Sequence, residues 1–153
     1  MTLGAKDPNV AATYTIDWHD ELVVPAYREY AFAQSSFVQG QRDTGWYYEC
    51  TTAGRTAHNY PQWPRAAGET VQDGSAAWTA RHPSSSTVPQ VSSAVWTVIG
   101  GGMAIDSQAQ GGALSSVVLS GGTDGVDYEV HCRMTPTIGA VMEKTITVPV
   151  RAQ

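Results

Sequence analysis

The sequence has 153 residues, of which only 15% are charged, and its many Gly, Ser, Thr and Ala residues suit one β-rich domain or two small β modules. Its formal net charge of −5 comes from scattered acidic residues without clustered Lys or Arg, which excludes nucleic acid as an expected partner. No leader pattern opens the sequence and no stretch approaches the roughly 20 apolar residues that cross a bilayer, so we expect no membrane association and a protein made in a cytoplasm.

The first predicted element is a strand from Ala12 to Trp18, which can run into a short turn at residues 17–20. On such a strand Asp17, His19 and Glu21 would alternate along one face, where their side chains could converge on a divalent metal. Metal sites usually carry well-separated ligand pairs with a recognisable spacing, and this stretch has none. We therefore expect a solvated face or turn, and no metal site.

The stretch from about Pro25 to Pro89 has a different character. It holds three of the five tryptophans and most of the tyrosines, and it ends in the linker-like segment His82–Pro89. Residues 28–37 could form a helix or a strand, because their apolar residues satisfy either period. The sequence predicts a second small β module here.

The C-terminal part predicts several short antiparallel strands separated by glycine-rich turns. The first runs from Val91 to Ile99 and ends at Gly100-Gly101-Gly102, and the next runs from Leu114 to Leu119. Two more, around residues 128–134 and 145–150, alternate strictly and form a hairpin through Thr137–Ala140. Their inward residues are Tyr128, Val130, Cys132, Met134, Ile146, Val148 and Val150.

Cys50 and Cys132 each occupy an apolar position of a predicted strand. A disulfide is the alternative, but nothing in the sequence indicates an oxidising compartment, so we expect two buried free thiols.

Catalytic patterns are weak throughout the sequence. Ser84-Ser85-Ser86 lie in a proline-flanked linker without a nucleophile elbow, and no carboxylates are placed as a pair. Gly100-Gly101-Gly102 does not open a helix, so a phosphate loop is also rejected. We expect no catalytic residues, no cofactor and no enzymatic activity.

Four segments together resemble a small module that is frequent in structural proteins of tailed phages and is itself similar to chitin-binding modules. They are residues 45–54 (GWYYECTTAG), 61–64 (PQWP), 68–74 (GETVQDG) and 77–79 (AWT). The flanking sequence looks like a phage structural domain of immunoglobulin-like type, through residues 6–18, 92–98 and 118–128.

In that immunoglobulin-like family the opening and the strand that carries Trp96 follow closely in sequence, whereas here the tryptophan-rich module separates them. The resemblance implies an all-β protein in which an antiparallel immunoglobulin-like β-sandwich, residues 1–24 and 90–153, is interrupted by an inserted β module, residues 25–89.

Exposed aromatics in chitin-binding-type modules hold glycans by stacking on sugar rings. On that resemblance, the candidates for glycan or partner contact are Trp46, Tyr47, Tyr60 and Trp63. The alternative is that a module this small needs its large side chains for a core. We expect Trp78 and Trp96 in the core, and leave both roles open for Trp46 and Trp63.

The two resemblances imply a bacteriophage virion structural protein. The function expected first is decoration or cementing of the capsid surface, with the major capsid protein as partner, self-association as a homo-oligomer, and an N-terminal arm, Met1–Val10, that orders on docking. The alternatives are a module of a tail fibre, collar or head surface that binds host surface glycan, and a head-tail or tail completion protein.

Overall fold

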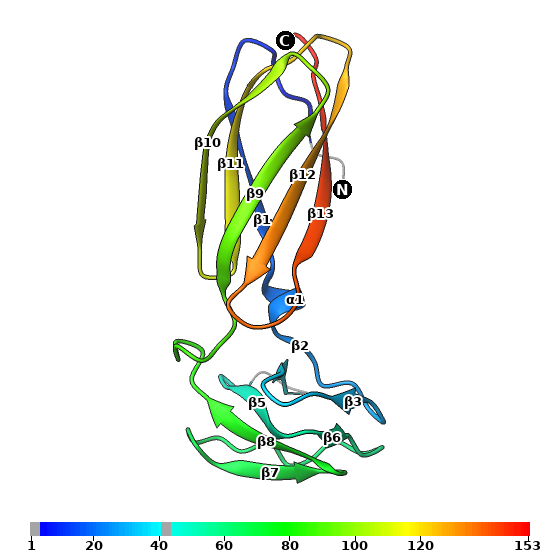
Figure 1. Ribbon diagram of the computed structural model, residues 1–153, viewed down its shortest axis with the longest axis vertical. Helices are drawn as coiled ribbons and strands as arrows, with labels where there is room; N and C mark the ends of the chain where they lie inside the picture. The colour runs from blue at the N-terminus through cyan, green and yellow to red at the C-terminus, as the bar shows by residue number, and fades with distance from the viewer. Residues whose placement is uncertain (1–3, 41–43) are drawn as a thin grey trace. The chain divides into compact units, whose positions relative to one another are not determined.

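The computed structural model describes residues 4–40 and 44–153, and its regular secondary structure is almost entirely β-strand (Figure 1). This confirms the all-β class predicted from sequence. The chain divides into two compact units, Met1–Trp18 with Gln90–Gln153, and His19–Pro89. No helix in the described residues is long and apolar enough to span a membrane.

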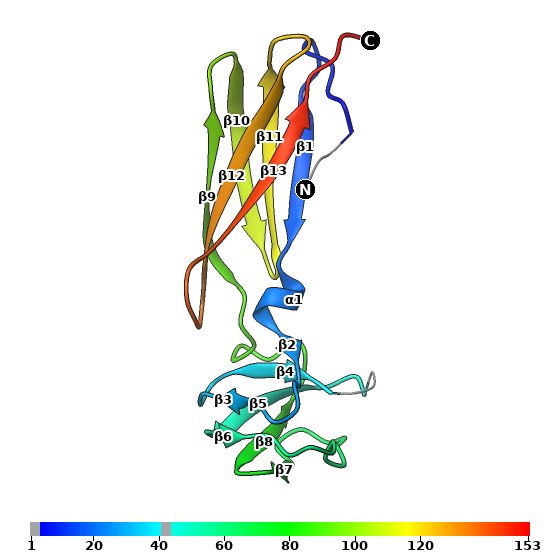
Figure 2. The same ribbon diagram turned by 90° about the vertical axis from the view of Figure 1, so that its right-hand side faces the viewer.

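The first unit consists of two three-stranded sheets that pack face to face as a sandwich (Figures 1 and 2). One sheet has the order β1-β11-β10, with β1 at Ala12–Asp17, β11 at Leu114–Gly121 and β10 at Met103–Gly111. The other has the order β13-β12-β9, with β13 at Met142–Pro149, β12 at Asp127–Pro136 and β9 at Val91–Ile99. All four strand pairs are antiparallel.

Strand β1 pairs with β11 although the two are about a hundred residues apart, and Thr13 lies opposite Val118. The alternation predicted for β12 and β13 is confirmed, since all seven of the predicted inward residues are buried. Gly139 closes the hairpin between them with a φ of 107°. Such a backbone conformation favours glycine, because residues with a side chain rarely adopt it.

The core of the first unit contains two tryptophans. Trp96 on β9 is buried, as predicted. Trp18 is completely buried, and its Nε1–H donates to Ser115 Oγ at 2.9 Å. The Lys144 ammonium lies 4.8 Å from the centre of the Trp18 ring, a cation–π contact.

Strand β10 was not predicted, because most of its residues are polar or small and exposed, so no alternating apolar pattern marks it. Its pairing with β11 shifts between Ile105 and Ser107, which leaves a bulge at Asp106.

The N-terminal segment is not the free arm expected from sequence. Lys6 is buried, bridges Val150 in parallel, and donates through Nζ to the carbonyls of Asp7 and Gly121. These bonds fix the chain from Lys6 onward, whereas Met1–Leu3 lie outside the described residues.

The second unit is built on a five-stranded sheet of order β2-β4-β5-β8-β7 and a two-stranded one, β3-β6. The strands are β2 Val24–Pro25, β3 Ala31–Phe32, β4 Phe37–Gln39, β5 Tyr47–Thr52, β6 Gly54–Arg55, β7 Thr70–Asp73 and β8 Ala76–Arg81. The sequence left residues 28–37 undecided between a helix and a strand. In the structure they contribute β3 and the start of β4. The pair β2–β4 is parallel, whereas the other strand pairs of this unit are antiparallel.

A short helix, α1 (His19–Leu22), precedes β2. The predicted alternation of Asp17, His19 and Glu21 on one strand is therefore wrong, because β1 ends at Asp17 and the other two lie on a helical turn. Within residues 4–40 and 44–153 no group of His, Cys, Asp and Glu side chains is placed to hold a metal ion.

Candidate contact surface

Trp63 is partly buried and packs against the core of the second unit. Its ring lies 4.5 Å from that of Tyr48 and 6.3 Å from that of Trp78, between centroids. A neighbouring glycine, Gly40, makes this packing possible, because a Cβ there would meet the Tyr48 and Trp63 rings at 3.1 and 3.4 Å. One face of the Trp63 indole is therefore not available to a ligand.

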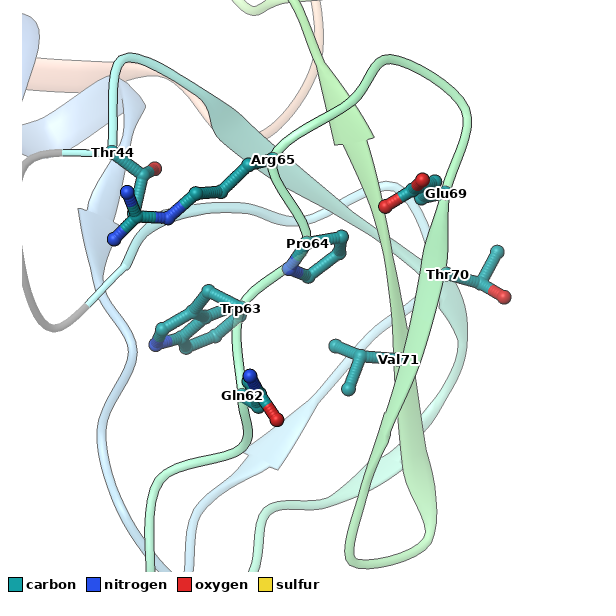
Figure 3. A pocket seen from close by; sticks show the side chains of 8 residues that line it. All are labelled: Thr44, Gln62, Trp63, Pro64, Arg65, Glu69, Thr70 and Val71. Atoms are coloured by element: carbon teal, nitrogen blue, oxygen red, sulfur yellow. The ribbon is translucent and has the colours of Figure 1, made fainter.

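The other side of Trp63 lines an open groove of about 680 Å³ (Figure 3). Its remaining lining residues are Thr44, Gln62, Pro64, Arg65, Glu69, Thr70 and Val71. The Trp63 Nε1–H is buried and has no hydrogen-bond partner among the described residues. The groove therefore combines the aromatic ring of Trp63 with one cationic side chain, Arg65, and one anionic side chain, Glu69.

Trp46 and Tyr47 have different environments. Trp46 is half-buried against the core. Its ring meets that of His82 edge-on, with 5.6 Å between the ring centroids. Tyr47 belongs to β5, where strand alternation places it on the opposite face from buried Tyr48, and its ring lies 5.7 Å from that of His19.

Tyr60 is the most exposed of the four residues predicted for contact, at 44%. The Arg28 guanidinium lies 4.4 Å from the centre of its ring. Tyr60 also lines a second pocket, of about 440 Å³, with Asp20, Pro25, Ala26, Tyr27, Gln39 and Gly40. Tyr60 and Trp63 thus line different hollows of the second unit, and the four aromatics do not form one stacking platform.

Two tyrosines that sequence reasoning missed, Tyr27 and Tyr30, complete an exposed aromatic cluster with Tyr60. Tyr27 and Tyr30 are 50% and 52% exposed, and their rings lie 5.5 Å apart. We call residues 27–30 together with Tyr60 the tyrosine turn. The 3-residue spacing of Tyr27 and Tyr30 suited a helical face, so the sequence did not reveal that both side chains would project from one turn.

The tyrosine turn is held by the buried Thr56. The Thr56 hydroxyl donates to the Tyr27 carbonyl at 2.7 Å and accepts from the Tyr30 N–H at 3.0 Å. The Thr56 N–H donates to the Tyr30 carbonyl at 2.9 Å. Between the tyrosines, Glu29 has a φ of 52°, which a non-glycine residue adopts only at a cost of about 1–3 kcal/mol. The surrounding bonds stabilise this conformation.

Arg28 anchors the same turn to the core through Asp73. The guanidinium makes two parallel bonds to the Asp73 carboxylate, each 2.8 Å, and the Asp73 side chain is completely buried. The carboxylate also accepts from the Ala57 N–H and from Trp78 Nε1–H, each at 3.0 Å. Burial alone would raise the pKa of Asp73, but these hydrogen bonds and the Arg28 charge outweigh it and lower the pKa.

The tyrosine turn therefore has the chemistry of a protein contact surface. Tyrosine and arginine are over-represented in energetically dominant interface positions, because they bury a large area with few rotatable bonds. Here Tyr27 and Tyr30 project from a turn whose backbone is fixed before binding by Thr56 and by the Arg28–Asp73 pair, which lowers the entropic cost of association.

Comparison with known proteins identifies one matching family. Residues 67–149 match the model of Gp77, described as podophage GP4 fiber-tail adaptor protein gp77. No curated protein and no solved structure matches the chain. The matched residues include β7 and β8 of the second unit and β9 to β13 of the first, which is more than half of the chain. The chain therefore belongs to the Gp77 family of bacteriophage virion structural proteins.

Proposed function

We propose that this protein is a fibre–tail adaptor, a structural subunit that attaches a fibre to the tail of a podophage virion. The observation that carries the proposal is the match of residues 67–149, which includes segments of both units. The earlier expectation of capsid decoration, with the major capsid protein as partner, has no comparable support. An attachment role requires no catalysis, and we propose none.

We assign the tyrosine turn as one contact surface of the adaptor. It lies outside the matched residues, and its support is physical: three exposed tyrosines, of which Tyr27 and Tyr30 flank an arginine that is bonded to buried Asp73. Such a surface can bury several aromatic side chains without first ordering its backbone.

The test is assembly of virions that carry Tyr27→Ala/Tyr30→Ala in place of the wild-type chain. Both side chains are exposed, so the variant is expected to fold and to enter the particle, and the adaptor role predicts particles with fewer fibres per tail. Ile138→Ala, an exposed apolar residue of the first unit, is the matched control. Normal fibre occupancy in the double variant would remove the tyrosine turn from the proposal.

The groove beside Trp63 favours a second candidate function, binding of a surface glycan. Its aromatic wall and the nearby Arg65, Glu69 and Gln62 offer one stacking surface with polar groups at its sides (Figure 3). Retention on a polysaccharide column that is lost in Gln62→Ala/Arg65→Ala would support it. Equal elution of variant and wild type would remove it, and leaves fibre attachment untouched.

A further inference from the structure

The outer edge of β9 is covered by side-chain amides of β10 where another strand could pair. The Ala94 N–H donates to Gln110 Oε1 at 3.2 Å, and Gln110 Nε2 donates to the Ser92 carbonyl at 2.9 Å. The Trp96 N–H donates to Gln108 Oε1 at 3.3 Å. The Gln110 amide thus accepts from one main-chain group of β9 and donates to another, as one residue of a neighbouring strand would.

These main-chain groups lie on the edge of β9 that faces away from β12. The two strands pair through their other edges, with Ala94 opposite Met134 and Trp96 opposite Cys132. Strands β9 and β10 lie next to each other in Figure 2. The bonds of Gln110 are solvent-exposed, so the edge can be reached from outside.

The sequence of β9 lacks the usual protection of an edge strand. Its nine residues, VSSAVWTVI, contain no charge and no proline, and Val95 and Ile99 are 59% and 49% exposed. Long uncharged edge strands with exposed apolar side chains pair readily with other strands, and proteins usually block them with charges, prolines or bulges. On β9 the two glutamine side chains occupy the edge.

We propose that the β9 edge is a pairing site for the β9 edge of a second copy of this chain, and that Gln108 and Gln110 occupy its main-chain groups in the single chain. A second copy fits because an antiparallel pair about a two-fold axis uses the same groups twice and brings no like charges together. Displacing the two amides would free the N–H groups of Ala94 and Trp96 and the Ser92 carbonyl to form hydrogen bonds with the β9 strand of the second copy. This pairing is independent of fibre attachment.

The test is sedimentation equilibrium of the full chain, wild type against Gln108→Ala/Gln110→Ala. Removing the amides is expected to lower the dimer dissociation constant by roughly 10-fold or more, since the freed groups gain partners only in the dimer. The exposed Gln90→Ala is the matched control and should associate as wild type does. Association of the double variant that equals the wild type's, or is weaker, overturns the proposal.

Two further variants show whether the β9 edge itself pairs. Ala94→Pro in the double-variant background removes an edge donor that β12 does not use, and is expected to return association to the wild-type level or below. Gln108→Glu/Gln110→Glu keeps acceptors for both N–H groups but adds charge, and is expected to associate no more strongly than wild type. Dimerisation of either variant as strong as that of Gln108→Ala/Gln110→Ala contradicts the assigned edge, with folding checked by circular dichroism.

Discussion

Asp73 connects the core of the second unit to its tyrosine turn. Its buried carboxylate accepts from Arg28, from the Ala57 N–H and from Trp78, so one side chain positions a strand end, a loop and the turn. Residues of this kind are hard to recognise from sequence, because Arg28 and Asp73 are 45 positions apart and neither lies in a charged run.

Replacing Asp73 with alanine is expected to destabilise the second unit by about 3–5 kcal/mol, since it leaves the Arg28 charge and the Trp78 N–H without their acceptor. Urea denaturation followed by tryptophan fluorescence measures the loss. Asp106→Ala, at an exposed position of β10, is the control and should change stability by less than about 1 kcal/mol. Equal effects of the two substitutions would contradict the role assigned to Asp73.

Asp73 also predicts a pH dependence of stability. Because its pKa is lower in the folded state than its ordinary value of 3.8, the unfolded chain binds the proton more readily. The stabilisation by this carboxylate is therefore complete above the ordinary value and is lost as the pH falls through the folded-state pKa. Urea unfolding measured across this acidic range should show a shallower decline for Asp73→Asn than for wild type. Parallel curves would rule out Asp73 as a source of the decline.

The two cysteines are expected to react slowly in the folded protein. Burial raises the pKa of both thiols, although Cys50 donates to the Thr52 carbonyl and Cys132 lies 3.5 Å from the Ser115 hydroxyl. Both are free and buried, as the sequence predicted. Labelling with a thiol reagent should be slow in native buffer and fast in denaturant; rapid native labelling of either cysteine would show that its strand opens readily.

At the scale of elements, the strands of the first unit that carry an apolar or alternating pattern were predictable, and β10 was not. β12 and β13 alternate between buried and exposed residues along their length, and Gly139 marks the hairpin between them. β10 carries large apolar residues only at its start, Met103 and Ile105, so its place in the sheet depends on pairing with β11, which a local pattern does not encode.

The contact surface was only partly predictable for the same reason. Tyr60 was singled out as an aromatic of the tryptophan-rich stretch, but its neighbours Tyr27 and Tyr30 lie about thirty positions earlier in the chain. They approach one another through Thr56 and Arg28, whose long-range bonds have no sequence signature.

The strained turn itself can be tested at Glu29. Glycine adopts a φ of 52° without the Cβ penalty, so Glu29→Gly should be more stable than Glu29→Ala by about 0.5–1 kcal/mol. Thermal unfolding of the two variants makes the comparison. A less stable glycine variant would show that the turn does not hold this conformation in solution.

At the scale of the molecule, the two units present different proposed contact sites. The first, Met1–Trp18 with Gln90–Gln153, is a sandwich with the proposed pairing edge on β9, and the second, His19–Pro89, carries the tyrosine turn. The family match includes strands of both, which supports a single structural role in the virion.

The most direct test of the adaptor proposal is chemical cross-linking of purified virions with mass spectrometry to identify the neighbours of this chain. The adaptor role predicts cross-links to both a tail subunit and a fibre subunit. Cross-links to the major capsid protein alone would contradict it and would restore the capsid-decoration hypothesis.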